Sequence, residues 1–210
     1  MTARRAIVVI AAAALALVSL VVARRTSGER VAAAVGARPS AVAGSTDAPL
    51  PVLDASPAPD VASLTTGWLN TAPLTPADLA GKVVLYDLWT FGCVNCQHTV
   101  PNLRVWHDRY AAEGLVIVGV HSPEFDYERD PANVAAAPRD QRIAYPVALD
   151  PDHRIWSAFD NHYWPSFFLY DRSGARRYTH IGEGAYATTE DAIRQLLGVD
   201  PASPRAAAPA

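Results

Sequence analysis

The two cysteines of the chain stand three positions apart, directly after an apolar run, and this arrangement constrains the fold most. Residues 83–89 read Val-Val-Leu-Tyr-Asp-Leu-Trp, which predicts a buried β-strand, and Gly92 marks a turn. Cys93 and Cys96 then begin a helical pattern, so both sulfurs lie near the start of one helix, about one turn apart. The helix dipole and the free N–H groups there favour a thiolate. A strand, a turn and a CxxC at a helix start together indicate thiol–disulfide exchange.

Charge and hydropathy limit the remaining possibilities. The net charge is −3, so nothing indicates a nucleic-acid partner, and two cysteines cannot build a disulfide scaffold. Residues 6–23 carry no charge and are flanked by arginine pairs. This length fits either a membrane-spanning helix or a long secretory segment. We therefore expect residues 1–25 to form an N-terminal membrane anchor or a cleaved signal. The remaining chain would then lie outside the cytoplasm, on the cell membrane or secreted.

The rest of the chain divides by composition into a linker, a domain and a tail. Residues 26–59 are rich in alanine and proline and predict a disordered linker, with an extra strand near residues 50–53 as the alternative. Residues 60–198 carry the alternating apolar segments of one folded domain. Residues 199–210 predict a disordered Ala/Pro tail.

Within the domain, the apolar segments predict an α/β order. The first unit is a strand at 82–89, a helix at 93–112 and a strand at 115–120, which implies a parallel β-α-β unit. The other expected elements are strands at 68–70, 145–149, 166–170 and 175–181, short helices at 75–79, 132–137 and 153–159, and a last helix. That last helix would be capped by Thr188, with Asp191 at the capping-box position and Gly198 beyond its end.

These features resemble the thioredoxin superfamily over residues 60–198. The resemblance rests on Cys93-x-x-Cys96 after a strand, Asp87 six residues earlier, and Pro101 eight residues after Cys93. It is strongest to TlpA/ResA-like proteins and to DipZ-type thioredoxin-like domains, on segments such as 119–125 and 163–165. The resemblance implies a central mixed β-sheet flanked by helices, with an insertion at about 121–146 after the first β-α-β unit. It also implies a cis-proline facing the cysteines, here Pro165.

The resemblance also assigns roles to the two thiols. Cys93 would be the attacking thiolate, and Cys96 would resolve the mixed disulfide, leaving a redox-active Cys93–Cys96 disulfide. Asp87 stands inside an apolar strand, where burial raises the pKa of a carboxyl, so it could accept the Cys96 proton through water. Alternatively, Asp87 points outward or belongs to a structural pair.

Other residues could contribute to substrate binding or tuning. Trp164, Pro165, Phe91 and Gly92 would form the substrate-binding surface, although Trp164 could equally be core packing. Glu124 and Glu183 follow strand ends and could tune cysteine acidity, or they could be solvated loop charges.

The function expected from this pattern is an exported, membrane-tethered thiol–disulfide oxidoreductase without cofactor or resident metal. Its partners would be disulfide-containing proteins, as in cytochrome c maturation, and a CcdA/DsbD-like membrane electron donor implied by the resemblance. Two alternatives stay open. The two thiols could carry Cu(I), which would make the protein a metallochaperone. A zinc site is not favoured, because Cys93, Cys96 and His98 have no adjacent fourth ligand. Thr90-x-x-Cys93 also matches peroxidases of the redoxin group, but Tyr86 stands where they need a proline.

Overall fold

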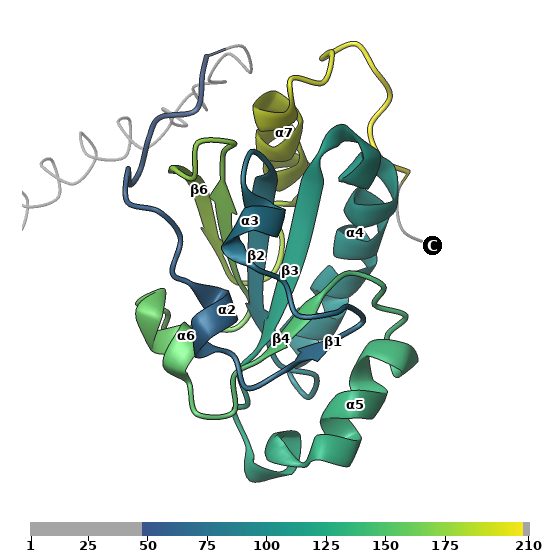
Figure 1. Cartoon of the computed structure of the whole chain (residues 1–210). Coiled ribbons are helices and arrows are strands. Elements are labelled where there is room, and N and C mark those ends of the chain that lie inside the picture. The colour runs from purple at the N-terminus through teal and green to yellow at the C-terminus, as the bar shows by residue number, and fades with distance from the viewer. Residues whose placement is uncertain (1–47, 208–210) are drawn as a thin grey trace, which may run out of the picture. The chain divides into compact units, whose positions relative to one another are not determined.

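The computed structural model describes residues 48–207, which form one six-stranded sheet with helices on both faces (Figure 1). The strands are β1 (Trp68–Leu69), β2 (Val83–Trp89), β3 (Leu115–His121), β4 (Val147–Leu149), β5 (Ser166–Tyr170) and β6 (Arg176–Ile181). The helices are α2 (Val61–Leu64), α3 (Pro76–Leu79), α4 (Val94–Tyr110), η1 (Ala111–Glu113), η2 (Asp126–Arg129), α5 (Pro131–Asp140), α6 (Arg154–Ala158) and α7 (Tyr186–Leu197).

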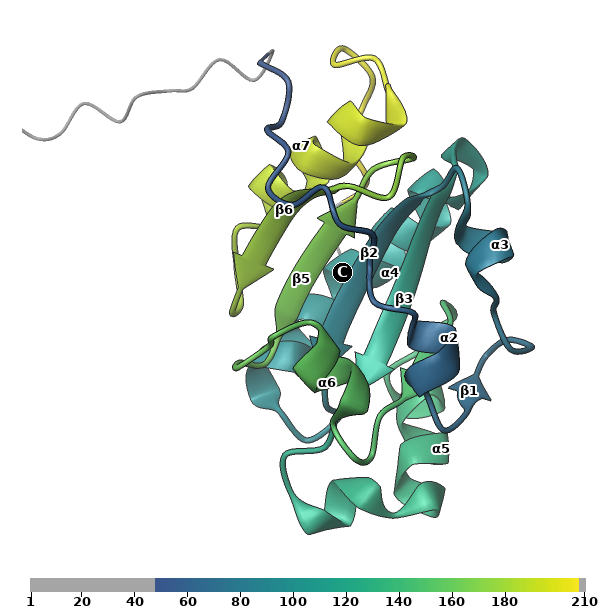
Figure 2. The same ribbon diagram turned by 60° about the vertical axis from the view of Figure 1, so that its left-hand side comes forward.

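The sheet is mixed and has the order β1-β4-β3-β2-β5-β6. The strand β2 lies parallel to β3 and antiparallel to β5, and β3 lies parallel to β4. The predicted parallel β-α-β unit is therefore confirmed as β2-α4-β3. The predicted insertion is confirmed between β3 and β4, where it contains η2 and α5. Figure 2 shows α5 beyond the ends toward which β2 and β3 point.

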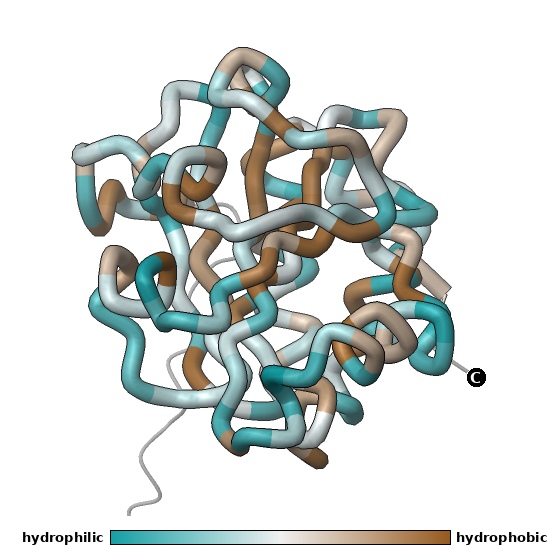
Figure 3. The backbone as a smooth tube through the Cα atoms, turned by 60° about the horizontal axis from the view of Figure 1, so that its bottom comes forward, coloured by the Kyte–Doolittle hydropathy of each residue, from teal (hydrophilic) through white to brown (hydrophobic). Residues whose placement is uncertain are grey.

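Alternating side chains of β2 divide the core between the two faces of the sheet. Val83, Leu85 and Trp89 pack on one face with buried residues of α4 and α7. Val84, Tyr86 and Leu88 pack on the other face with Val61 of α2 and Ile155 of α6. This period of two is the normal geometry of a strand, and both faces are covered, so every residue of β2 is buried. Figure 3 shows the hydrophobic strands inside and hydrophilic loops around them.

The predicted linker ends earlier than residue 59. The Leu53 N–H donates to the Arg176 carbonyl at 2.8 Å, and the Arg176 N–H donates to the Asp54 carbonyl at 2.8 Å. An isolated β-bridge thus joins Asp54 to β6. Disorder is therefore the wrong prediction for residues 50–54, because the outer strand β6 offers unpaired backbone groups that they satisfy. The alternative of an extra strand near residues 50–53 was closer to the structure.

The last helix begins before its predicted cap. The helix α7 starts at Tyr186 after Ala185, which has φ 49°, so Thr188 lies inside the helix. The side chain of Asp191 binds Arg205 at 2.5 Å and does not form a capping box. The Thr-x-x-Asp pattern misled because the carboxylate has a stronger, charged donor from a distant part of the chain.

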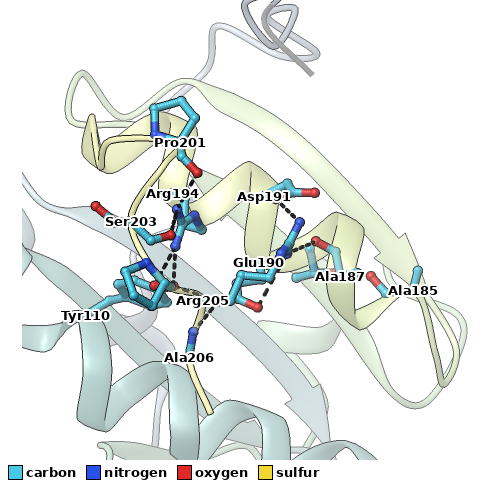
Figure 4. Close-up of polar contacts among 12 residues, drawn as sticks. Tyr110, Ala185, Ala187, Glu190, Asp191, Arg194, Pro201, Ser203, Arg205 and Ala206 are labelled. Carbon is cyan, nitrogen blue, oxygen red and sulfur yellow. Dashed lines mark hydrogen bonds and ion pairs between the residues drawn. The ribbon is translucent and has the colours of Figure 1, made fainter. Parts of the chain in front are cut away.

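The predicted disordered tail is also wrong for residues 199–207, which lie against α7 (Figure 4). The buried Arg194 guanidinium donates to the carbonyls of residues 200, 201, 203 and 204 at 2.9–3.3 Å. The buried Glu190 carboxylate accepts from the Tyr110 hydroxyl at 2.6 Å and from the Ala206 N–H at 2.7 Å. The tail thereby completes the hydrogen bonds of two buried charges, as such charges require.

The predicted membrane anchor or signal, residues 1–25, lies outside the part of the chain that the structure describes, as does most of the predicted linker. Within residues 48–207, no helix is long and apolar enough to cross a membrane.

Candidate redox site

The two cysteines occupy the first turn of α4 and differ sharply in exposure. Cys93 is the N-cap residue of α4 and is partly exposed, whereas Cys96 is fully buried. The Cys96 N–H donates to Cys93 Sγ at 3.4 Å. The Cys93 N–H in turn donates to the Thr90 carbonyl at 3.4 Å, which closes the turn before the helix. Cys93 is therefore accessible to another protein, whereas Cys96 is shielded from solvent.

The two thiols also differ in acidity. Hydrogen bonding from the Cys96 thiol, followed by the backbone N–H groups of Cys96 and Asn95, lowers the pKa of Cys93 to about 6. Partial burial and the charge of Glu124 oppose this shift. Burial raises the pKa of Cys96 above the usual thiol range. Cys93 is thus the thiolate at neutral pH, and Cys96 keeps its proton, as expected for an attacking and a resolving thiol.

This difference predicts two separate alkylation profiles in the reduced protein. The rate of Cys93 alkylation by iodoacetamide should rise with a midpoint near pH 6, because the thiolate is the nucleophile. Cys96 should stay unmodified up to about pH 9, because it is buried and its pKa is raised. Peptide mass spectrometry after timed quenching measures both rates. A Cys93 midpoint near the ordinary thiol value would contradict the prediction.

Asp87 lies on the same face of β2 as Val83, Leu85 and Trp89, the face covered by α4. Its side chain is fully buried, and neither carboxylate oxygen has a hydrogen-bond partner among residues 48–207. Burial therefore raises the pKa of Asp87 well above its usual range, and the Cys93 thiolate adds to this shift. The two alternatives to the proton-acceptor role, an outward orientation and a structural pair, are therefore wrong. Asp87 is a buried carboxyl without a hydrogen-bond partner among residues 48–207, and its role as proton acceptor for Cys96 stays a prediction.

The Trp164–Pro165 peptide bond is cis, as the resemblance implied. The Trp164 indole N–H donates to the Ser122 carbonyl at 2.9 Å, and its ring lies 4.1 Å from that of Trp156. The Pro165 carbonyl accepts from the Gly182 N–H at 2.8 Å. Trp164, Cys93 and Phe91 all pack partly buried against the core cluster on the α4 face. The role of Trp164, Pro165, Phe91 and Gly92 in substrate binding stays a prediction.

The two other glutamates named from the sequence have different surroundings. Glu183 is half-exposed and pairs with His98 of α4 at 3.1 Å, two residues after Cys96. Glu124 is exposed in the insertion, and its charge raises the pKa of Cys93 slightly against the larger opposing effects. Among the described residues, no three His, Cys, Asp or Glu side chains are grouped to hold a metal ion.

Sequence reasoning missed two buried polar residues at this site. His121, at the end of β3, stacks on Phe91 with ring centroids 5.4 Å apart and lies 3.3 Å from the Thr90 hydroxyl. Burial lowers its pKa to about 4, so it is neutral at pH 7. Glu128 of η2 is fully buried and accepts the Gly92 N–H at 3.0 Å. Its only sequence signal was its position three residues after Phe125, where a glutamate can cap a helical turn.

Comparison with known proteins places this geometry in a family. A model described as the AhpC/TSA family matches residues 55–179. The chain belongs to the AhpC/TSA family. This AhpC/TSA protein is 44% identical to DipZ of Mycobacterium tuberculosis (strain CDC 1551 / Oshkosh) over 143 residues, which are 67% of the chain and 20% of DipZ. The chain thus spans about a fifth of the length of that relative.

Two further comparisons cover nearly whole proteins. The AhpC/TSA chain is 28% identical to the thiol-disulfide oxidoreductase YkuV of Bacillus subtilis (strain 168), over 62% of the chain and 87% of YkuV. A crystal structure of a thiol-disulfide isomerase from Corynebacterium glutamicum is 25% identical with a TM-score of 0.58, covering 72% of this chain and 97% of the other. The thioredoxin-like fold and the DipZ- and ResA-like resemblance expected from the sequence are confirmed.

Proposed function

We propose that this protein is a thiol–disulfide oxidoreductase that reduces disulfides in other proteins. One observation carries the proposal: two neighbouring thiols at one helix start have opposite exposure and opposite pKa shifts. A structural disulfide gains nothing from such a difference, whereas exchange requires one accessible thiolate and one protected thiol. The likeness to YkuV supports the same reaction class.

The reaction follows from the positions of the three groups. The Cys93 thiolate attacks one sulfur of a substrate disulfide; that S–S bond breaks, and the other substrate sulfur leaves as a thiolate and takes a proton. The ionised form of Asp87 then accepts the Cys96 proton, and the Cys96 thiolate attacks Cys93 Sγ. The mixed disulfide breaks, and the second substrate thiolate leaves. Two electrons have passed to the substrate, and the Cys93–Cys96 disulfide remains.

The proposal extends to the place of the reaction and its partners. Residues 1–25 would tether the domain outside the cytoplasm, and a CcdA/DsbD-like membrane protein would return the two electrons. The substrates would be extracytoplasmic proteins with disulfides, such as apocytochrome c. Support comes from the uncharged segment 6–23 and from the resemblance to membrane-tethered TlpA/ResA-like proteins.

The equilibrium potential tests the direction of electron flow. The purified domain is equilibrated with glutathione buffers, and the reduced fraction is read by thiol labelling. A value near that of thioredoxin, about −270 mV, supports a reductant, whereas a value near about −120 mV indicates an oxidant and contradicts the proposal. Insulin reduction with dithiothreitol measures turnover in parallel. Stoichiometric Cu(I) binding or peroxide turnover without insulin reduction would favour the metallochaperone or the peroxidase instead.

A further inference from the structure

Glu128 is a fully buried carboxylate whose bonds join two parts of the redox site. Its Oε1 accepts the Gly92 N–H at 3.0 Å, and its Oε2 accepts the N–H groups of Glu124 at 2.6 Å and Phe125 at 2.9 Å. A buried carboxylate is costly unless such donors surround it. The two local bonds shape η2, while the third reaches 36 residues back to the turn before α4.

The turn that receives this bond sets the start of α4. Gly92 directly precedes Cys93, and the Thr90 carbonyl accepts the Cys93 N–H. The insertion touches the same turn a second time, because Gln141 Nε2 donates to the Phe91 carbonyl at 3.3 Å. The insertion thus fixes the backbone immediately before the N-cap thiol, whose sulfur must meet the Cys96 N–H.

Gly92 is required for this close approach. A Cβ atom at this position would overlap the Tyr127 hydroxyl and the Glu128 carboxylate. The turn therefore packs directly on η2, and no side chain fits between them.

We propose that Glu128 is a positioning residue of the redox site, which holds the Gly92 N–H so that the first turn of α4 presents its N–H groups to Cys93. This inference rests on the proposed attack by Cys93. The held turn stabilises the thiolate, because the sulfur stays aligned with the donors that lower its pKa.

Replacing Glu128 with glutamine tests this role at nearly constant volume. Glutamine has one acceptor oxygen and an NH2 group, so in either orientation a donor faces at least one of the three N–H groups. We expect the alkylation midpoint of Cys93 to rise by about one pH unit, which corresponds to roughly tenfold less thiolate well below the midpoint. The matched control is Asp126→Asn, which removes the same charge from an exposed position of η2 and should leave the midpoint unchanged.

The sign of the shift separates positioning from other roles. If Glu128 acted only through its charge, Glu128→Gln would lower the pKa of Cys93, because a nearby negative charge disfavours a thiolate. If it served stability alone, the free energy of unfolding would fall while the midpoint stayed at its original value. Either result overturns the inference. If Cys93 is not the more acidic thiol in the unaltered protein, the proposed function fails instead.

A second variant keeps the test independent of how well Glu128→Gln folds. Gly92→Ala places a methyl group against the Glu128 carboxylate and separates the same two partners from the other side. It should raise the Cys93 midpoint in the same direction. An unchanged midpoint in folded Gly92→Ala protein would overturn the inference.

Discussion

Replacing Cys93 with serine is expected to abolish disulfide reduction, with a loss of turnover on the order of 10³-fold or more. The reason is that Cys93 carries the accessible thiolate, with a pKa of about 6, whereas a serine hydroxyl stays protonated and cannot displace a sulfur. Cys96 cannot substitute for it, because Cys96 is buried and its pKa is raised. Insulin reduction at pH 7 measures the loss.

Cys96→Ser provides the matched comparison for this prediction. It keeps the attacking thiolate but removes the thiol that resolves the mixed disulfide. The variant should therefore accumulate covalent adducts with substrate, detected as a mass increase that dithiothreitol reverses, and the adducts should vanish in the double variant. Adducts that form in Cys93→Ser and not in Cys96→Ser would show that the two roles are reversed.

The redox centre could be predicted because its determinants are close together in the sequence. The β-branched run of β2, the turn at Gly92 and the CxxC spacing each act over a few residues, so local rules placed the two cysteines at a helix start. Asp87 could be singled out because burying a carboxylate within an apolar strand is costly, so its presence there calls for an explanation. The cis-proline came from the resemblance alone, since X–Pro bonds are cis in only about 5% of cases.

The residues that sequence reasoning missed depend on partners far away in the chain. Glu128 resembles any charge of a polar insertion, and only the folded chain brings the Gly92 N–H to it. The tail and the segment before α2 were misjudged for the same reason. Their order depends on the buried Arg194 and Glu190 side chains of α7 and on the open edge of β6. An Ala/Pro-rich segment buries too little apolar surface to fold by itself. Its composition does not show whether the folded domain offers it unpaired hydrogen-bonding groups.

Asp87→Asn is expected to stabilise the reduced protein at neutral pH by about 1.4 kcal/mol for each pH unit by which burial raises the pKa of the carboxyl, because the folded state must retain a proton that the unfolded chain releases. The pKa of Asp87 is raised in the folded state, so folding favours the protonated form. Its contribution to stability is complete below the unfolded-state pKa of about 3.9 and is lost as the pH rises toward the folded-state pKa. The gain of Asp87→Asn should therefore be small below pH 4 and grow up to neutral pH.

Urea unfolding of both reduced proteins across this pH range measures the difference. A gain that does not depend on pH would show that the carboxyl is not the cause, and a loss of stability at every pH would show that Asp87 has a structural partner.

The same variant should resolve mixed disulfides about 10²-fold more slowly, since an amide cannot accept the Cys96 proton. Formation of the mixed disulfide by Cys93 should keep its rate, because that thiol is already a thiolate at pH 7. Stopped-flow measurement of the two steps distinguishes them. Together, greater stability and slower resolution would show that the chain keeps an unfavourable buried carboxyl for the second half of the exchange reaction.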